Sequence, residues 1–199
     1  AGGSPAAAGA APQAAEAPLA LRAVLRSGDL WRFVATFSLL QAVGSGVFIA
    51  NLGLMAESLG VAAEERLAYV RTVSYCNCLG RLAAGCLLDA CEPRGVPRAA
   101  HTVWTAAVLS LAAAALRLAP DEWMQGLLFP MLVLVGFAYG ANWAIMPSFV
   151  SRRFSNCHVG VCFNANASVM SCAVLLTSSA AGALYDAAAA AAPAPAAGH

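Results

Sequence analysis

Apolar residues occur in long blocks along this chain, and short charged segments separate the blocks. The first block, 33–56, carries no charged side chain and lies between Arg32 and Glu57. A helix needs about 20 mainly apolar residues to cross the hydrocarbon core of a bilayer. Such blocks predict helices at about 31–57, 66–89, 99–118, 124–150 and 158–184. We therefore predict an all-α fold, a polytopic membrane helix bundle with five transmembrane helices.

The second predicted helix, 66–89, is the most polar of the five. It contains Arg71 near its start and Arg81 two turns before Asp89. An arginine within a membrane span must be shielded by protein or water, because placing its charge in lipid costs free energy. We expect this helix to face the bundle interior or a water-filled cavity rather than lipid alone.

The two ends of the chain differ in composition from this central region, 30–186. Residues 1–29 begin with alanine, glycine and proline and predict a disordered cytoplasmic linker. Residues 187–199 predict a disordered tail of alanine and proline. The first residue is alanine and no signal peptide pattern opens the chain, so we expect a fragment of a longer protein.

Composition favours an integral membrane protein and excludes nucleic acid as a partner. Hydrophobic residues make up 60% of the 199 residues and charged residues 11%, against about 25% charged residues in soluble domains. The formal net charge is +1, so the chain offers no broad basic surface for nucleic acid.

The 11 basic residues are all arginines, and their positions predict the orientation of the bundle. Most of them precede the first predicted helix or follow the second and the fourth: Arg22, Arg26, Arg32, Arg94, Arg98, Arg152 and Arg153. Arginine and lysine are enriched in cytoplasmic loops. We therefore expect a multi-pass protein whose N-terminus is cytoplasmic.

No pattern of metal-binding, cofactor-binding or catalytic residues is present. The seven cysteines are odd in number and lie mostly in apolar blocks, where cysteine behaves as a small apolar residue. Their spacing fits no common zinc pattern. The serines of the last predicted helix have no histidine and carboxylate at membrane depth, and glycine-rich phosphate loops are absent. We expect no metal, no cofactor and no enzymatic activity.

Amide and tyrosine side chains inside the predicted helices are candidates for lining a solute cavity. They are Gln41, Asn51, Tyr75, Asn77, Tyr139, Asn142, Asn164 and Asn166. An amide offers both a donor and an acceptor to a bound solute. The same groups can instead hydrogen-bond neighbouring helices. Asn164 and Asn166 lie about 200° apart around a helix, so they cannot both face one cavity.

Small residues and a proline mark positions where helices are expected to approach each other closely. Gly44 and Gly46 flank Ser45 in the first predicted helix, and Gly136 and Gly140 form a G-x-x-x-G pair in the fourth. Glycine allows backbones of neighbouring helices to come close. Pro147 removes a helical hydrogen bond and predicts a kink.

The segment GRLAAGCLLDACEPRGVPR, 80–98, carries a recognisable motif. Its order is G-x-L-x-D followed by R-G-x-x-R, with Gly85 and Asp89 in the first part and Arg94 and Arg98 in the second. This motif resembles the signature loop of the major facilitator superfamily of transporters, which joins the second and third helices of each six-helix half.

Four further segments resemble the nodulin-like branch of that superfamily, which is similar to monocarboxylate transporters. They are NLGLMAESLG, NCLGRLAAG, YGANWAIMPSFVSRRF and GALYD, and they occur in the order typical of the branch. The resemblance covers about 30–186. It implies the C-terminal half of a carrier, with five of its six helices present. The implied partners are the lipid bilayer, the missing N-terminal six-helix half and a small-molecule solute.

The resemblance also implies a gating cluster of charges at the cytoplasmic end. Its candidate members are Arg81, Gly85, Asp89, Arg94, Arg98, Arg152 and Arg153. Arg81 either binds an anionic solute or pairs with Asp89 or a helix C-terminus, and we expect the structural pairing. We also expect Asp89 to pair with Arg152 or Arg153 and so hold the inward gate closed.

The resemblance implies secondary active or facilitative transport of a small organic solute by two bundles that rock about a central site. The alternative is a non-transporting membrane receptor or assembly subunit, in which the polar residues only join helices. A membrane enzyme is a third hypothesis, which the sequence favours far less than the other two.

Overall fold

The structure, a computed structural model, describes residues 20–154 and 156–191. Every regular element in these ranges is helical, which confirms the predicted all-α fold. The main helices are α1 (Leu21–Arg26), α2 (Gly28–Leu39), α3 (Val47–Ala50), α4 (Leu52–Ser58), α5 (Ala63–Cys91), α6 (His101–Leu118), α7 (Asp121–Phe154) and α8 (Val159–Ala191). A π-helical segment, Leu40–Gly46, joins α2 to α3. Short 3₁₀ turns, Glu92–Arg94, Arg98–Ala100 and Asn156–His158, join the later helices.

Four segments of the described chain are long and apolar enough to cross a membrane. They are Gly28–Ala50, Arg98–Leu118, Glu122–Phe154 and Asn156–Ala187. Helix α5 has 29 residues but is less apolar, because Glu64, Glu65, Arg66, Arg71, Arg81 and Asp89 lie along it. The structure therefore supports a membrane helix bundle with four candidate spans, and a fifth span through α5 stays a prediction.

The first predicted helix, 31–57, begins earlier than expected and is interrupted. It is helical from Gly28, widens into the π-helical segment and breaks at Asn51, where φ is −102° and ψ is 7°. Asn51 Nδ2 donates to the carbonyl of Val47 at 2.8 Å, so the amide satisfies a backbone group at the end of α3. Asn51 thus has a local structural task that the sequence did not reveal.

Two segments predicted to be disordered are ordered helices where the structure describes them. Helix α1 lies within the predicted linker, and the side chain of Val24 is 1% exposed because it packs with Leu30 and Val150. Helix α8 continues through the alanine run to Ala191, in keeping with the high helix propensity of alanine. The linker and tail predictions for 1–19 and 192–199 lie outside the described residues.

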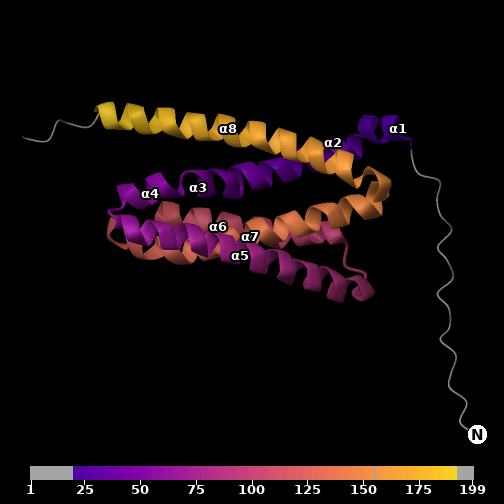
Figure 1. The fold of residues 1–199 in the computed structure, drawn as a ribbon, viewed down its shortest axis with the longest axis horizontal. Helices are drawn as coiled ribbons and strands as arrows, with labels where there is room; N and C mark the ends of the chain where they lie inside the picture. The colour runs from indigo at the N-terminus through magenta and orange to yellow at the C-terminus, as the bar shows by residue number, and fades with distance from the viewer. Residues whose placement is uncertain (1–19, 155, 192–199) are drawn as a thin grey trace, which may run out of the picture.

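The helices lie side by side as long rods, with α8 along one edge and α5 toward the other (Figure 1). Helix α7 packs against both α5 and α6, and α8 packs mainly against α2 and the π-helical segment. Among the four candidate spans α7 is the most enclosed and α8 the least. The interior of the bundle is therefore built around α7, which stays helical through Pro130 and Pro147.

Helices α5 and α7 touch along a line of glycines. A Cβ atom added to Gly80 would lie 2.1 Å from the carbonyl oxygen of Phe137, and one added to Gly140 would lie 2.0 Å from that of Asn77. A Cβ at Gly136 would lie 3.1 Å from the Cβ of Cys76. The two backbones are thus close enough that only glycine fits at the first two positions.

The other predicted packing glycines differ in their surroundings. A Cβ at Gly46 would lie 2.8 Å from Cγ2 of Val174, so α8 approaches the π-helical segment closely there. A Cβ at Gly85 would meet nothing within 4 Å. The surroundings of Gly44 lie outside what the structure describes.

Candidate functional site

Two of the predicted cavity residues, Gln41 and Asn142, are buried between helices and form hydrogen bonds there. Thr105 Oγ1 of α6 donates to Asn142 Oδ1 of α7 at 2.8 Å, and Asn142 Nδ2 donates to Gln41 Oε1 at 3.4 Å. Ser45 Oγ donates to the same Gln41 oxygen at 3.3 Å. The side chains of Gln41, Asn142 and Thr105 are fully buried, so this network joins the π-helical segment to α6 and α7.

A second buried hydrogen bond joins α2 to α8. Ser38 Oγ donates to Asn166 Oδ1 at 3.1 Å, and Asn166 is fully buried. Gln41 Nε2 and Asn166 Nδ2 have no hydrogen-bond partner among the described residues. Together the two sets of bonds connect four helices through polar groups, as expected of amides that join neighbouring helices.

We expect Asn142→Leu to lower the stability of the bundle. The change removes the acceptor of Thr105 and the donor to Gln41 from a fully buried site, at a cost of about 1–2 kcal/mol. Asn164→Leu is the matched control, because Asn164 is an exposed amide on α8. Thermal unfolding of both purified variants in one detergent measures the difference, and equal melting temperatures would contradict a structural role for the network.

The remaining cavity candidates do not converge on one site. Tyr75 is 69% exposed, and Asn164 is exposed on the other side of α8 from the buried Asn166, as their spacing predicts. Tyr139 lines a largely apolar hollow of about 480 Å³ between the π-helical segment, α7 and α8, which Ser171 and Ser178 also line. Among the described residues these candidates therefore lie on different faces, and which of them contact a solute stays a prediction.

Arg81 lies beside Asn77 and Trp143 rather than beside a carboxylate. Its Nε donates to Asn77 Oδ1 at 3.1 Å, and its guanidinium carbon lies 5.9 Å from the centroid of the Trp143 ring. Asp89 is two turns further along α5, roughly 12 Å along the axis, which is too far for an ion pair. The expected pairing of Arg81 with Asp89 is wrong, and the exposed Arg81 keeps donors free for another group.

A cluster of charges at the end of α5 centres on Glu92. Arg98 Nη2 lies 2.6 Å from Glu92 Oε2, and Arg152 forms an ion pair with the other oxygen of the same carboxylate. Arg98 also donates to the hydroxyl of Ser148 on α7. Asp89 is exposed and belongs to none of the ion pairs found in the described residues, so its predicted role as partner of Arg152 or Arg153 is wrong. Glu92 is the carboxylate that pairs with Arg152, because α5 ends at Cys91 and the chain turns there toward α7.

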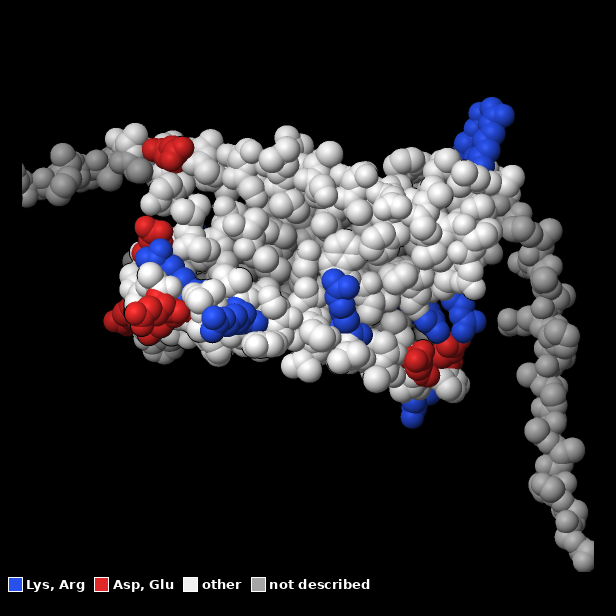
Figure 2. Space-filling model, viewed as in Figure 1, with Lys and Arg blue, Asp and Glu red and all other residues white. Residues whose placement is uncertain are grey.

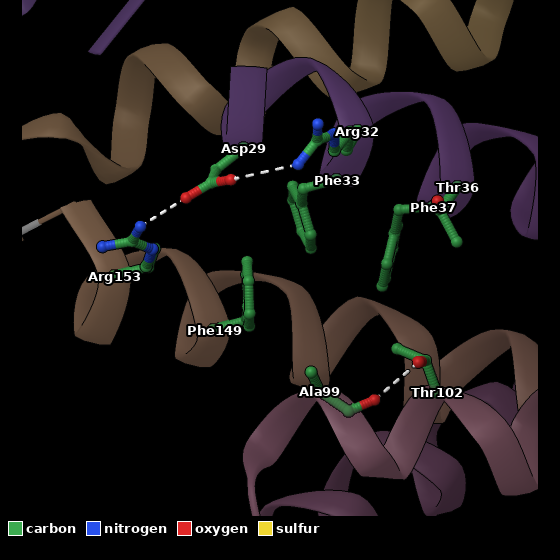
Figure 3. A pocket seen from close by; sticks show the side chains of 9 residues that line it. All are labelled: Asp29, Arg32, Phe33, Thr36, Phe37, Ala99, Thr102, Phe149 and Arg153. Atoms are coloured by element: carbon green, nitrogen blue, oxygen red, sulfur yellow. Dashed lines mark hydrogen bonds and ion pairs between the residues drawn. The ribbon is translucent and has the colours of Figure 1, made fainter. Parts of the chain in front are cut away.

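A second cluster at the same end centres on Asp29, at the start of α2. Arg153 of α7 forms an ion pair with Asp29, and Arg32 Nη1 lies 3.8 Å from Asp29 Oδ1 (Figure 3). Arg94 instead donates to the backbone carbonyl of Ala90 at 2.5 Å, which satisfies a carbonyl at the end of α5. The sequence pattern had singled out the arginines and missed both carboxylates. Asp29 lies outside the motif segment, and Glu92 lies between its two parts at a position that the motif leaves open.

The two clusters show that three arginine-bearing segments far apart in sequence meet at one end of the bundle. Asp29 lies at the start of the first span, Glu92 and Arg98 follow α5, and Arg152 and Arg153 lie at the end of α7. Figure 2 shows charges gathered at the two ends of the molecule, with a mostly uncharged band between them. Which side of a membrane this end faces stays a prediction of the arginine distribution.

Hollows beside these clusters combine charged and apolar walls. One of about 280 Å³ lies between α2, α7 and the start of α6, next to Asp29 and Arg153. An adjoining one of about 310 Å³ lies beside Glu92 and Arg98. Within 20–154 and 156–191 no three histidine, cysteine, aspartate or glutamate residues come together in a way that could hold a metal ion.

Comparisons of the chain with models of known protein families, with curated protein sequences and with solved structures returned no match.

Proposed function

We propose that this chain is part of a carrier that moves a small organic solute across a membrane, with α5 as a fifth span. The proposal follows from the resemblance of 30–186 to the nodulin-like branch of the major facilitator superfamily and from the position of Arg81. Arg81 is the arginine in the middle of α5. It is exposed and has no carboxylate partner among the described residues.

The exposed charge is the observation that carries this proposal. An arginine at the centre of a span that faces lipid costs about 2.5–3.5 kcal/mol or more, whereas one that faces water does not. The face of α5 with Arg81 is therefore expected to line an aqueous path, and the N-terminal half of the carrier would close that path on its other side.

The surroundings of Arg81 suit the recognition of a small polar or anionic group. The ring of Trp143 lies beside the guanidinium. Tyr139 meets Trp143 edge to face at 6.1 Å, and Phe163 of α8 lies 5.4 Å from Trp143. A planar guanidinium has five donors, of which Asn77 uses one. A solute with a carboxylate would bind the others.

Uptake measurements test the transport proposal. Labelled monocarboxylates and amino acids are offered to proteoliposomes that contain the full-length protein, with empty liposomes as the control. Saturable uptake of at least one solute is the expected result. A protein that takes up none of them, and whose melting temperature no solute raises, would favour the non-transporting receptor or assembly subunit, a reading that the buried amide network also fits.

Within this proposal the Glu92 and Asp29 clusters act as the gate at the arginine-rich end. We expect Glu92→Gln to let the arginine-rich ends of α5 and α7 separate more easily, because Arg98 and Arg152 lose their shared carboxylate. The free energy of unfolding should fall by no more than about 1 kcal/mol, because these ion pairs are partly exposed. Asp89→Asn is the matched control, since Asp89 is exposed and outside the ion pairs described above. Labelling of a cysteine placed at Ser148 should become faster in Glu92→Gln only, and faster labelling in both variants would argue against this gate.

A further inference from the structure

We propose that the hollow between α2, α7 and the start of α6 binds one anionic phospholipid, with its phosphate at Arg32 and Arg153 and an acyl chain along Phe33, Phe37 and Phe149. This proposal requires only that the bundle lies in a membrane. It does not depend on transport, and the residues involved are not those near Arg81.

The charges at the mouth of the hollow leave room for one anion. Asp29 is the only carboxylate among the described residues that line it, and it faces two guanidinium groups. Arg32 is 86% exposed and lies 3.8 Å from Asp29, the outer limit of an ion pair, so most of its donors remain available. Two arginines against one carboxylate leave a net positive charge, which a phosphate monoester or diester would neutralise.

The inner wall of the hollow is apolar and aromatic. Phe33 stacks on Phe149 with ring centroids 4.6 Å apart, and Phe37 follows at 5.3 Å from Phe33. Figure 3 shows these rings in a row that leads from the Asp29 cluster toward Ala99 and Thr102. Phe37 is 1% exposed and forms the floor of the hollow, whereas Phe33 and Phe149 are half-buried. A free inorganic anion would use the arginines alone and leave Phe33 and Phe149 partly in contact with water, whereas an acyl chain would cover them.

The position of the hollow matches the layer in which phospholipid headgroups lie. It belongs to the arginine-rich end of the bundle, and the hollow beside Glu92 and Arg98 adjoins it through Ala99, Phe149 and Arg153. Basic pockets between spans at the cytoplasmic interface commonly hold anionic headgroups. The positive charge, the apolar wall and the position at the arginine-rich end of the bundle therefore all favour an amphiphilic ligand, a phospholipid.

The test uses the protein in nanodiscs of phosphatidylcholine with and without phosphatidylglycerol, and lipid retained after transfer to mild detergent is counted by native mass spectrometry. We expect one phosphatidylglycerol per chain in preference to phosphatidylcholine. Arg32→Gln should weaken retention about fivefold, which corresponds to about 1 kcal/mol per arginine near the headgroup layer. Thr36→Trp, at the exposed edge of the hollow, should fill the acyl site and lower retention while leaving every charge in place. Arg22→Gln, an exposed arginine on α1 outside the hollow, is the matched control.

Each remaining outcome overturns the proposal. Equal losses in Arg32→Gln and Arg22→Gln would mean unspecific attraction to anionic lipid. Unchanged lipid retention in Thr36→Trp would mean that the acyl chain does not lie in this hollow. Displacement of the lipid by millimolar inorganic phosphate, with equal thermal stabilisation by phosphate alone, would assign the arginines to a free anion. Because both substituted residues are exposed, the lipid-free variants should melt close to the original protein, which separates loss of binding from loss of fold.

Discussion

Replacing Gly80 with alanine should destabilise the bundle by about 2 kcal/mol or more, although alanine is the better helix former. The added Cβ would lie 2.1 Å from the carbonyl oxygen of Phe137 and 3.1 Å from the amide nitrogen of Ala141, both backbone atoms of α7. Backbone atoms cannot rotate away as a side chain can, so α5 and α7 must move apart. Because α7 also packs against α6, the loss extends beyond one pair of helices.

Gly85→Ala is the control that makes this result specific. It is the same substitution on the same helix, but its Cβ would meet nothing within 4 Å. The variant should therefore be unchanged or up to about 1 kcal/mol more stable, owing to helix propensity alone. Thermal or denaturant unfolding in detergent compares the two proteins. If both variants were destabilised by a similar amount, the close packing of α5 and α7 would not require glycine at position 80.

Arg81→Gln should lower the uptake of an anionic solute at least about tenfold, with little change in the amount of folded protein. A charged hydrogen bond to a carboxylate contributes about 1.5–3 kcal/mol, and glutamine keeps a donor but loses the charge. The loss of fold should be small, because Arg81 is exposed and its partners among the described residues are the amide of Asn77 and the ring of Trp143.

Uptake as a function of solute concentration distinguishes binding from a structural effect. A raised KM with a nearly unchanged maximal rate is expected if Arg81 holds the solute. Arg71→Gln serves as the control, because Arg71 is also an exposed arginine of α5 but lies nearer the start of that helix. If uptake falls equally in both variants, or if Arg81→Gln transports like the original protein, the solute site is elsewhere.

The arginines predicted to form a gating cluster show what a motif can and cannot indicate. The pattern of charges correctly directed attention to Arg98, Arg152 and Arg153, and these side chains do meet at one end. Their carboxylate partners were not predictable from it. Asp89 lies inside the motif but remains on the exposed side of α5. Glu92 lies past the end of the helix and forms ion pairs with Arg98 and Arg152.

The amides illustrate the same limit. Gln41, Asn142 and Asn166 were chosen for their chemistry, and the sequence left open whether they bind a solute or neighbouring helices. Rotation of each helix about its axis decides that question. It placed Gln41 against Asn142 and Asn166 against Ser38, while Tyr75 and Asn164 remained exposed. Gly80 escaped notice because its partner is a backbone carbonyl of α7, for which no sequence signal exists.

What the sequence alone determined is the class of structure: helices, their approximate limits and a composition suited to lipid. These follow from local causes, since apolar blocks of sufficient length must satisfy their own backbone hydrogen bonds in a bilayer and do so as helices. The tertiary structure decided which polar groups are buried, which carboxylate serves each arginine and where two backbones touch. Those outcomes depend on the rotation, depth and separation of helices far apart in the chain, which side-chain packing sets only when all of them are assembled.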